Sequence, residues 1–402
     1  MEKLLNPDRS PSAGNNKPLA APVALNDFLR EIYSNLAFAE KVRTLEAFAR
    51  FVNGAAGRDC ADAIKGIMAV PVGSGWEFEL PSSTPQVSGL VNGRSFQPFL
   101  ASVYSYFLAT ASRSDSLRFY RFFTGCRRLK DERPTLRAVE REAIQIATKR
   151  WRKDARRSMG NNGSFVAGRE FGFRIHRMAT PEAERALALL LPDPDRIFEE
   201  GVPLSGRGSG CSSVRVRIGD GTYFLKRYDC RGLGYRVKNI FRRSRALKVW
   251  IATWGFLARS LPVPRPLLFL EERQCRLLGR AYILSEFHEG AERLMNLWPL
   301  LQDREKDCVL IKSAMLLGMV NRFNCIHGDT NWDNLLITDR SRFDLIMVDL
   351  DCAKIPFRLS PARAFRDIQH FVRDLCREKN AGCGKKEFFV QLWRRWYLSN
   401  TV

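Results

Sequence analysis

Apolar positions in the first part of the chain recur every three to four residues, which predicts helices. One series covers residues 28–36 and a second covers residues 42–52, with Asn26 as the expected N-cap of the first helix. Residues 95–112 are uncharged, but polar positions interrupt them and they fall short of the roughly 20 apolar residues of a membrane span. We therefore expect a buried helix there.

Residues 127–157 combine an apolar stripe with many arginines and lysines, which predicts one long basic helix. Two interpretations stay open for its charge: a solvated face, or a surface that docks on phosphates or anionic lipid. Residues 70–95, rich in Pro, Gly and Ser, predict a loop or a small hairpin.

The pattern changes after about residue 160, where short β-like runs replace long helical ones. These runs cover residues 213–218, 223–226 and 281–286. The sequence thus predicts an α+β protein in three parts: a disordered segment 1–22, a helical region 23–160, and a second domain 161–402. We divide that domain into a β-rich N-lobe, residues 161–288, and a helical C-lobe, residues 289–402.

The strongest chemical signal is the stretch His327-Gly328-Asp329, followed by Asn334 five residues after the aspartate. A hairpin of two apolar strands follows and delivers Asp349 at its end. This spacing brings three oxygen-bearing side chains to one place. Asp329 can accept the proton of a substrate hydroxyl, while Asn334 and Asp349 can hold Mg²⁺ against the phosphates of ATP.

A glycine-rich stretch with Gly206, Gly208 and Gly210 opens a strand upstream, and Lys226 lies on the next strand. Such a loop covers nucleotide phosphates with backbone N–H groups, and the lysine reaches them from the sheet. Backbone groups near Glu286 and Phe287 are expected to meet the adenine edge. The order of glycine loop, strand lysine, catalytic loop and strand aspartate is the order of a kinase fold.

Segments 224–228, 231–233, 241–246 and 261–266 resemble the lipopolysaccharide kinase family (Kdo/heptose kinase, WaaP-like), and the later block also fits aminoglycoside and choline kinases. The resemblance implies a protein-kinase-like two-lobed fold that transfers the γ-phosphate of ATP, with Mg²⁺, to a sugar hydroxyl of the lipopolysaccharide inner core. It implies Lys226 as the nucleotide lysine, Asp329 as the catalytic base, and Asn334 and Asp349 as metal ligands. Asp351 falls where the family often keeps a second acid, for which we expect a supporting role.

One departure from the kinase pattern concerns the partner of Lys226. Kinases pair this lysine with a glutamate on the following helix, yet no acidic residue occurs between Asp229 and Glu271. Lys226 must be oriented by another group, or the site is weakened. Residues 113–120 faintly resemble the closing helix of a kinase C-lobe, so the helical region is either a remnant of a first copy or a plain helical extension.

The charge balance points to anionic partners, with 65 Lys and Arg against 43 Asp and Glu and a formal net charge of +22. A basic segment follows Lys226, and we expect it to contact a phosphorylated glycolipid acceptor through Arg231, Arg242, Arg243 and Arg245. No zinc spacing or nucleic-acid recognition motif occurs, and we expect no nucleic-acid partner. The ten cysteines are expected to be free thiols.

The polar N-terminus lacks the apolar core of a signal peptide, and we expect a bacterial cytoplasmic enzyme at the inner membrane surface. The aromatic and basic stretch 388–397 either lies at the membrane or packs on the C-lobe. Two alternatives to the glycolipid kinase stay open. One is a kinase for another small-molecule or protein hydroxyl, and the other is a degenerate pseudokinase scaffold.

Overall fold

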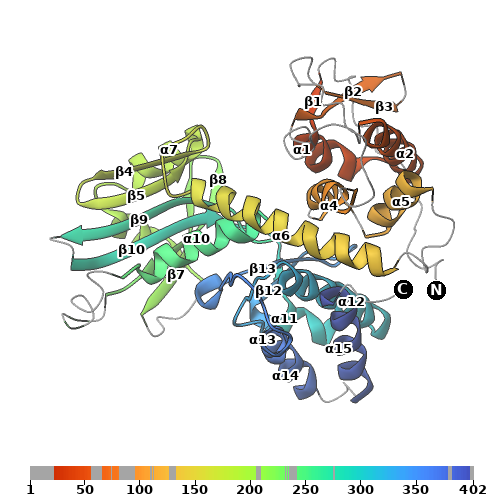
Figure 1. Cartoon of the computed structure of the whole chain (residues 1–402). Coiled ribbons are helices and arrows are strands. Elements are labelled where there is room, and N and C mark those ends of the chain that lie inside the picture. Colours follow the sequence, from red (N-terminus) through yellow and green to blue (C-terminus); the bar gives the residue numbers. More distant parts are fainter. Residues whose placement is uncertain are drawn as a thin grey trace. The chain divides into compact units, whose positions relative to one another are not determined.

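The computed structural model describes residues 22–55, 66–73, 75–80, 96–108, 111, 113–125, 133–204, 210–230, 232, 234, 242–274, 277–378 and 383–398. The segment 1–22, predicted to be disordered, lies outside these ranges except for its last residue. Contacts divide the chain into two compact units, Met1–Ile146 and Ala147–Val402, and each is described by itself. The helices and strands of both are labelled in Figure 1.

The first unit combines a small antiparallel sheet with helices around an aromatic core. The sheet has the order β1 (Val23–Ala24), β2 (Met68–Val72), β3 (Gly75–Glu79). Of the two alternatives for residues 70–95, the hairpin is therefore found in their first part, while residues 81–95 lie outside the described ranges. The helices are α2 (Phe38–Ala55), α4 (Phe96–Phe107) and α5 (Arg113–Thr124), and α4 is the buried helix that the sequence predicts. Their core contains Phe48, Phe107 and Phe119.

The first predicted helix is wrong in its details. Three short pieces replace it: α1 (Leu25–Asp27), a π-helical turn (Phe28–Ile32) and a 3₁₀ turn (Tyr33–Asn35). The helix begins at Leu25 after Ala24, so Asn26 is not its N-cap. Leu25 is buried and its N–H donates to the carbonyl of Ile67 at 3.0 Å, so tertiary contacts fix this start.

The long basic helix is confirmed as α6 (Arg133–Arg157). The boundary between the compact units falls inside it, at Ile146/Ala147, earlier than the expected boundary at residue 160. In the second unit, Trp151 packs on Phe323 with ring centroids 5.0 Å apart. The following basic side chains of α6 are exposed, which fits both a solvated face and a docking surface: Arg137, Arg141, Lys149, Lys153, Arg156 and Arg157.

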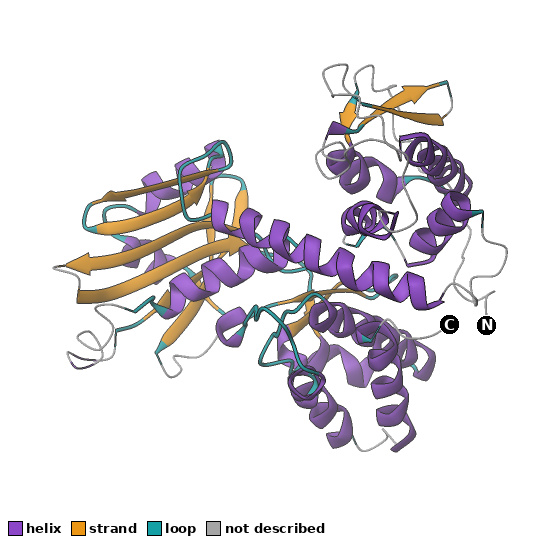
Figure 2. Cartoon of the chain, in the orientation of Figure 1, coloured by secondary structure: helices purple, strands orange, loops and turns teal. Residues whose placement is uncertain are grey.

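The N-lobe is built on one antiparallel sheet of the described residues, with strand order β4-β5-β9-β10-β8-β7-β6. Its strands are β4 (Phe165–Glu170), β5 (Phe173–Met178), β6 (Val202–Pro203), β7 (Cys211–Ile218), β8 (Gly221–Tyr228), β9 (Pro266–Gln274) and β10 (Leu277–Glu286). The three predicted runs are confirmed as β7, β8 and β10. In Figure 2 this sheet is the large group of orange arrows at the left.

The alternation of side chains along β8 determines on which face of the sheet Lys226 lies. Leu225 belongs to the core on the face covered by α7 (Pro181–Leu190) and α8 (Pro194–Glu200). Because successive side chains in a strand point to opposite faces, Lys226 lies on the other face. Tyr228 lies there too and packs with α10 (Arg245–Leu257).

The C-lobe consists mainly of helices: α11 (Leu294–Leu297), α12 (Asp303–Arg322), α13 (Pro361–Asp367), α14 (Gln369–Arg377) and α15 (Cys383–Tyr397). A small sheet, β11 (Glu292–Arg293), β12 (Leu335–Asp339) and β13 (Asp344–Met347), lies among them. Phe389 and Trp393 of α15 are buried, so the C-terminal stretch packs on the C-lobe. Among the described residues, no helix is long and apolar enough to cross a membrane. The α+β class is confirmed.

Candidate active site

The loop of residues 327–334, which the sequence predicts to carry the catalytic base, connects α12 to β12. His327 is fully buried, and its Nε2 lies 3.0 Å from the carbonyl of Val348. Burial lowers the pKa of His327 and keeps the imidazole neutral. Gly328 has φ of 85°, and any Cβ there would collide with the backbone of Cys352. The position therefore requires glycine.

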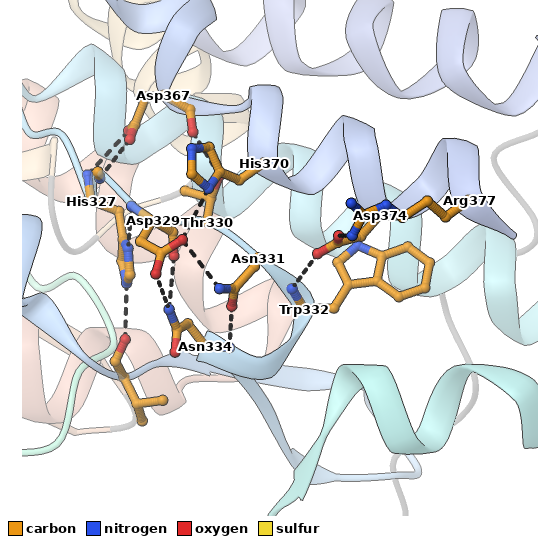
Figure 3. A network of polar contacts seen from close by, with 12 residues as sticks. His327, Asp329, Thr330, Asn331, Trp332, Asn334, Asp367, His370, Asp374 and Arg377 are labelled. Carbon is orange, nitrogen blue, oxygen red and sulfur yellow. Dashed lines mark hydrogen bonds and ion pairs between the residues drawn. The ribbon is translucent and has the colours of Figure 1, made fainter. Parts of the chain in front are cut away.

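Asp367, at the end of α13, holds the start of this loop. Its carboxylate accepts the N–H groups of His327 at 3.1 Å and Gly328 at 2.7 Å, and the side-chain amide of Asn321 at 2.9 Å. Its carbonyl accepts the hydroxyl of Thr330 at 2.6 Å. Asp367 is buried, so it holds three positions of the loop with little competition from solvent, two through its carboxylate and one through its carbonyl (Figure 3).

Asp374, on α14, fixes the middle of the loop. It accepts the N–H of Trp332 at 3.0 Å and forms an ion pair with Arg377 at 3.6 Å. Trp332 is buried against Trp298 and Phe371. The loop is thus held from α13 and α14, which leaves Asp329 facing outward with its side chain 35% exposed.

Asp329 accepts hydrogen bonds from two asparagines and lies beside a histidine. The amide nitrogen of Asn331 lies 3.1 Å from Oδ1, and that of Asn334 lies 3.2 Å from Oδ2. Nδ1 of His370, on α14, lies 2.9 Å from Oδ1. These neighbours fix the orientation of the carboxylate while it stays open to solvent, as a general base requires.

Asn334 and Asp349 fit a magnesium ion by their donor atoms. The amide nitrogen of Asn334 is engaged with Asp329, so its side-chain oxygen is the ligand atom that remains. The N–H of Val348 donates to the carbonyl of Asn334 at 2.9 Å, which places Asp349 next to it. Among the described residues, no three His, Cys, Asp or Glu side chains form a metal cluster, so these two ligands need phosphate oxygens or water to complete a coordination sphere.

Asp349 has a left-handed backbone with φ of 59°, uncommon for a residue with a side chain. Its side chain is 42% exposed, and Oδ1 lies 2.8 Å from Nζ of Lys226. Burial alone would raise the pKa of Asp349, but Lys226 outweighs it and lowers the pKa. The carboxylate is therefore ionised and accessible, as a metal ligand must be.

Lys226 forms a second ion pair, with Oδ2 of Asp351 at 2.8 Å. Burial disfavours the charged ammonium, yet Asp351 and Asp349 outweigh it and raise the pKa of Lys226. Asp351 also accepts hydrogen bonds from the hydroxyl of Tyr228 at 2.7 Å and from Nη2 of Arg245 at 2.7 Å. The structure therefore supplies the partner of Lys226 that the sequence lacks on the helix.

The other predicted residues fall in different places. The guanidinium of Arg245 contacts Asp351, while Arg242 and Arg243 are exposed and Arg231 lies outside the described residues. Gly206 and Gly208 also lie outside them. Gly210 has φ of 94°, which favours glycine, and its carbonyl accepts the N–H of Asp229 at 3.1 Å.

At the predicted adenine edge, the N–H of Glu286 donates to the carbonyl of Arg265 at 3.0 Å. The side chain of Glu286 also forms an ion pair with Arg265 at 2.7 Å. The N–H of Glu286 is therefore engaged within the protein, and the predicted contact of this group with an adenine edge stays a prediction. Phe287 follows, and the guanidinium carbon of Arg215 lies 5.8 Å from its ring centroid.

Sequence reasoning missed Asp367, His370 and Asp374. Their spacing of three and four residues was a usable signal, because it places polar side chains on one side of a helical segment. No sequence pattern, however, indicates that this side of the segment packs against the loop about 40 residues earlier.

No protein-family model matches the chain. A search of curated proteins likewise finds no match. Among solved structures, the chain is similar to one described as "WaaP in complex with acyl carrier protein", with a TM-score of 0.41 and 16% identity, covering 54% of this chain and 88% of that chain. These values are too low to transfer any property to this chain.

Proposed function

We propose that the chain is an ATP- and Mg²⁺-dependent kinase with a kinase-like fold that phosphorylates a sugar hydroxyl, Kdo or heptose, of the lipopolysaccharide inner core. One observation carries the phosphotransferase part: Lys226 from the sheet meets Asp349 at 2.8 Å, and Asp349 adjoins the Asn334–Asp329 pair. Residues more than 100 positions apart in the sequence thus lie next to one another, with the nucleotide lysine, the metal ligands and the base in the succession that phosphoryl transfer needs.

Asp329 is the base in this proposal. As the acceptor hydroxyl oxygen bonds to the γ-phosphorus, a carboxylate oxygen of Asp329 takes the hydroxyl proton. The bond between the γ-phosphorus and its bridging oxygen breaks, and the electron pair leaves with ADP. Asn331, Asn334 and His370 hold the carboxylate for this step.

Lys226 and the two metal ligands handle phosphate charge. The ammonium of Lys226 would contact the α- and β-phosphates, while Asn334 and Asp349 would hold Mg²⁺. When bound, Mg²⁺ neutralises charge on the phosphates. Lys226 is already oriented by two carboxylates, which supports a working nucleotide site over a degenerate one.

The nature of the acceptor rests on charge. The net charge of +22 favours an anionic partner, and Arg242 and Arg243 are exposed just before α10. A second basic and aromatic stretch is exposed around α13: Phe357, Arg358, Arg363, Phe365 and Arg366. Such a surface suits anionic headgroups, and we place the enzyme at the cytoplasmic face of the inner membrane.

The test is transfer of labelled γ-phosphate from ATP to purified core glycolipid ending in Kdo or heptose. We expect transfer by the wild type and none above background by Asp329→Ala. Asp339→Ala is the matched control, because this acid lies at the end of β12 with its side chain 40% exposed, and it should keep wild-type transfer. Equal transfer by Asp329→Ala and the wild type would refute the assignment of the base.

Two other functions give different outcomes. A kinase for another small molecule or protein would leave the glycolipid unlabelled and label a member of a wider hydroxyl panel, with the same dependence on Asp329. A pseudokinase scaffold would label nothing, and Mg²⁺-ATP would fail to raise its melting temperature.

A further inference from the structure

Helix α10 lacks the acid that a kinase lysine usually meets. All of its residues, Arg245–Leu257, are described, and none is Asp or Glu. Its first residue is instead Arg245, directly after the N-cap Ser244, whose hydroxyl accepts the N–H of Leu247 at 3.0 Å. A cation thus stands on the helix that faces Lys226.

Asp351 compensates the positive charge of both Lys226 and Arg245. Its Oδ2 accepts both Lys226 at 2.8 Å and Arg245 at 2.7 Å, while Oδ1 accepts the hydroxyl of Tyr228 at 2.7 Å. Its side chain is only 4% exposed, against 42% for Asp349. We call this group of four residues, Lys226, Tyr228, Arg245 and Asp351, the Asp351 junction.

The difference in exposure separates the roles of the two acids. Asp349 is open to solvent and suits a metal ligand, because coordination requires accessible oxygens. A carboxylate bound to Mg²⁺ has less negative charge to offer Lys226. Asp351 is enclosed by two cations and a phenol, so its oxygens would stay with the lysine when Asp349 holds Mg²⁺.

We propose that Asp351 is the positioning residue for Lys226, in place of the missing helix glutamate, and that Arg245 joins helix α10 to the site through the same carboxylate. This inference rests on the proposed kinase function. Gly255, on the same helix, is in close contact with Ile355, so α10 already packs on the segment that carries Asp351.

The first test is the variant Asp351→Asn. Its kcat and its KM for ATP are measured by steady-state kinetics. In a second assay without nucleotide, mass spectrometry measures the rate at which a succinimidyl ester acylates Lys226. We expect kcat/KM to fall on the order of 100-fold, the cost of a misplaced catalytic group, with much of the loss in KM for ATP. Lys226 should be acylated about 10-fold faster once Asp351 no longer holds it.

The matched control is Asp195→Asn. Asp195 also accepts from a tyrosine and two arginines, namely Tyr282 at 2.6 Å, Arg227 at 3.2 Å and Arg280, but its partner Arg227 faces away from the site. This variant should lose stability without a change in KM for ATP or in the acylation of Lys226.

The double variant Asp351→Asn/Arg245→Met tests whether Asp351 positions Lys226 or only neutralises Arg245. It also removes the cation that Asp351→Asn leaves unpaired and that could unfold the single variant. If Asp351 positions Lys226, the double variant stays as impaired as Asp351→Asn. Recovery of KM and of slow acylation would overturn the inference, because Asp351 would then serve only to neutralise Arg245. If the wild type does not bind ATP, the proposed function fails, while the acylation rates still decide the role of Asp351.

Discussion

The two ends of the site hold their key side chains in opposite ways. Asp329 is 35% exposed and is held by two amides and an imidazole, whereas Asp351 is 4% exposed and is held by two cations and a phenol. The first environment leaves a carboxylate free to accept a proton. The second uses a buried charge to fix a lysine.

Under the proposed function, this difference indicates which departures from a kinase pattern the site tolerates. The end with Asp329 depends on hydrogen bonds from its own loop and from α13 and α14. At the lysine end, an acid can come from a different element if it reaches the same ammonium. The helix lacks the glutamate, but two aspartates from another segment of the chain form ion pairs with Lys226 in its place.

The largest expected effect separates the chemical roles of the two ends. Asp329→Asn should lower kcat about 1,000-fold and leave the affinity for Mg²⁺-ATP within about threefold, since a lost general base affects the chemical step. Lys226→Met should instead weaken nucleotide binding about 100-fold, the upper value of a charge-assisted hydrogen bond. Steady-state kinetics with nucleotide titrations would check this, and a matching loss of affinity in both variants would contradict the comparison.

The next effect tests whether the base end depends on its helix anchor. Asp367→Ala should destabilise the second unit by about 3 kcal/mol, because three buried N–H donors lose one acceptor. It should also lower kcat at temperatures where the protein stays folded. Urea unfolding and kinetics at low temperature would measure both, and a stable, fully active variant would show that the loop holds itself.

Acid should weaken the second unit through His176, which is buried beside Trp250 and Phe269. Neither ring nitrogen has a hydrogen-bond partner among the described residues. Burial, with a smaller effect of Arg174, lowers its pKa from 6.5 to about 4. As pH falls below 6.5, the unfolded chain binds a proton that the folded protein refuses. Stability should therefore fall by about 2 kcal/mol between pH 7.5 and 5.

His176→Phe should remove most of that slope, because phenylalanine fits the aromatic site and carries no titrating group. Urea unfolding at both pH values would test it, with the wild type as reference. Equal slopes would assign the acid sensitivity elsewhere, for example to His327, whose pKa burial also lowers.

The smallest effect concerns His370 and the orientation of the base. His370→Ala should lower kcat about 10-fold, the value of one hydrogen bond to a charged group. His370→Asn, whose amide nitrogen can replace Nδ1 as the donor, should stay within about threefold of the wild type. If asparagine is as poor as alanine, the imidazole does more than orient Asp329.

The sequence predicted the catalytic loop, its hairpin and Asp349 because these features lie within about 25 consecutive residues. It could not predict that Asp367, His370 and Asp374 hold the loop, since that depends on how α13 and α14 pack. Asp351 and Tyr228 are 123 residues apart, so their contact follows only from the tertiary fold. Strands β4 and β5 were missed because charged residues and a glycine interrupt their apolar pattern.

The position of Asp351 in the chain determines how the site can be switched. In a kinase whose lysine pairs with the helix, rotating the helix is enough to release the lysine. Here both acids that hold Lys226 belong to the segment after β13, in the C-lobe, while the lysine belongs to the N-lobe sheet. Rotation of α10 would remove only Arg245 from the junction, and separation of the lobes is the movement that must break both ion pairs. An inhibitor that displaces this helix would therefore leave both ion pairs of Lys226 intact. An inhibitor that separates the lobes would break both ion pairs and leave the lysine without a fixed position.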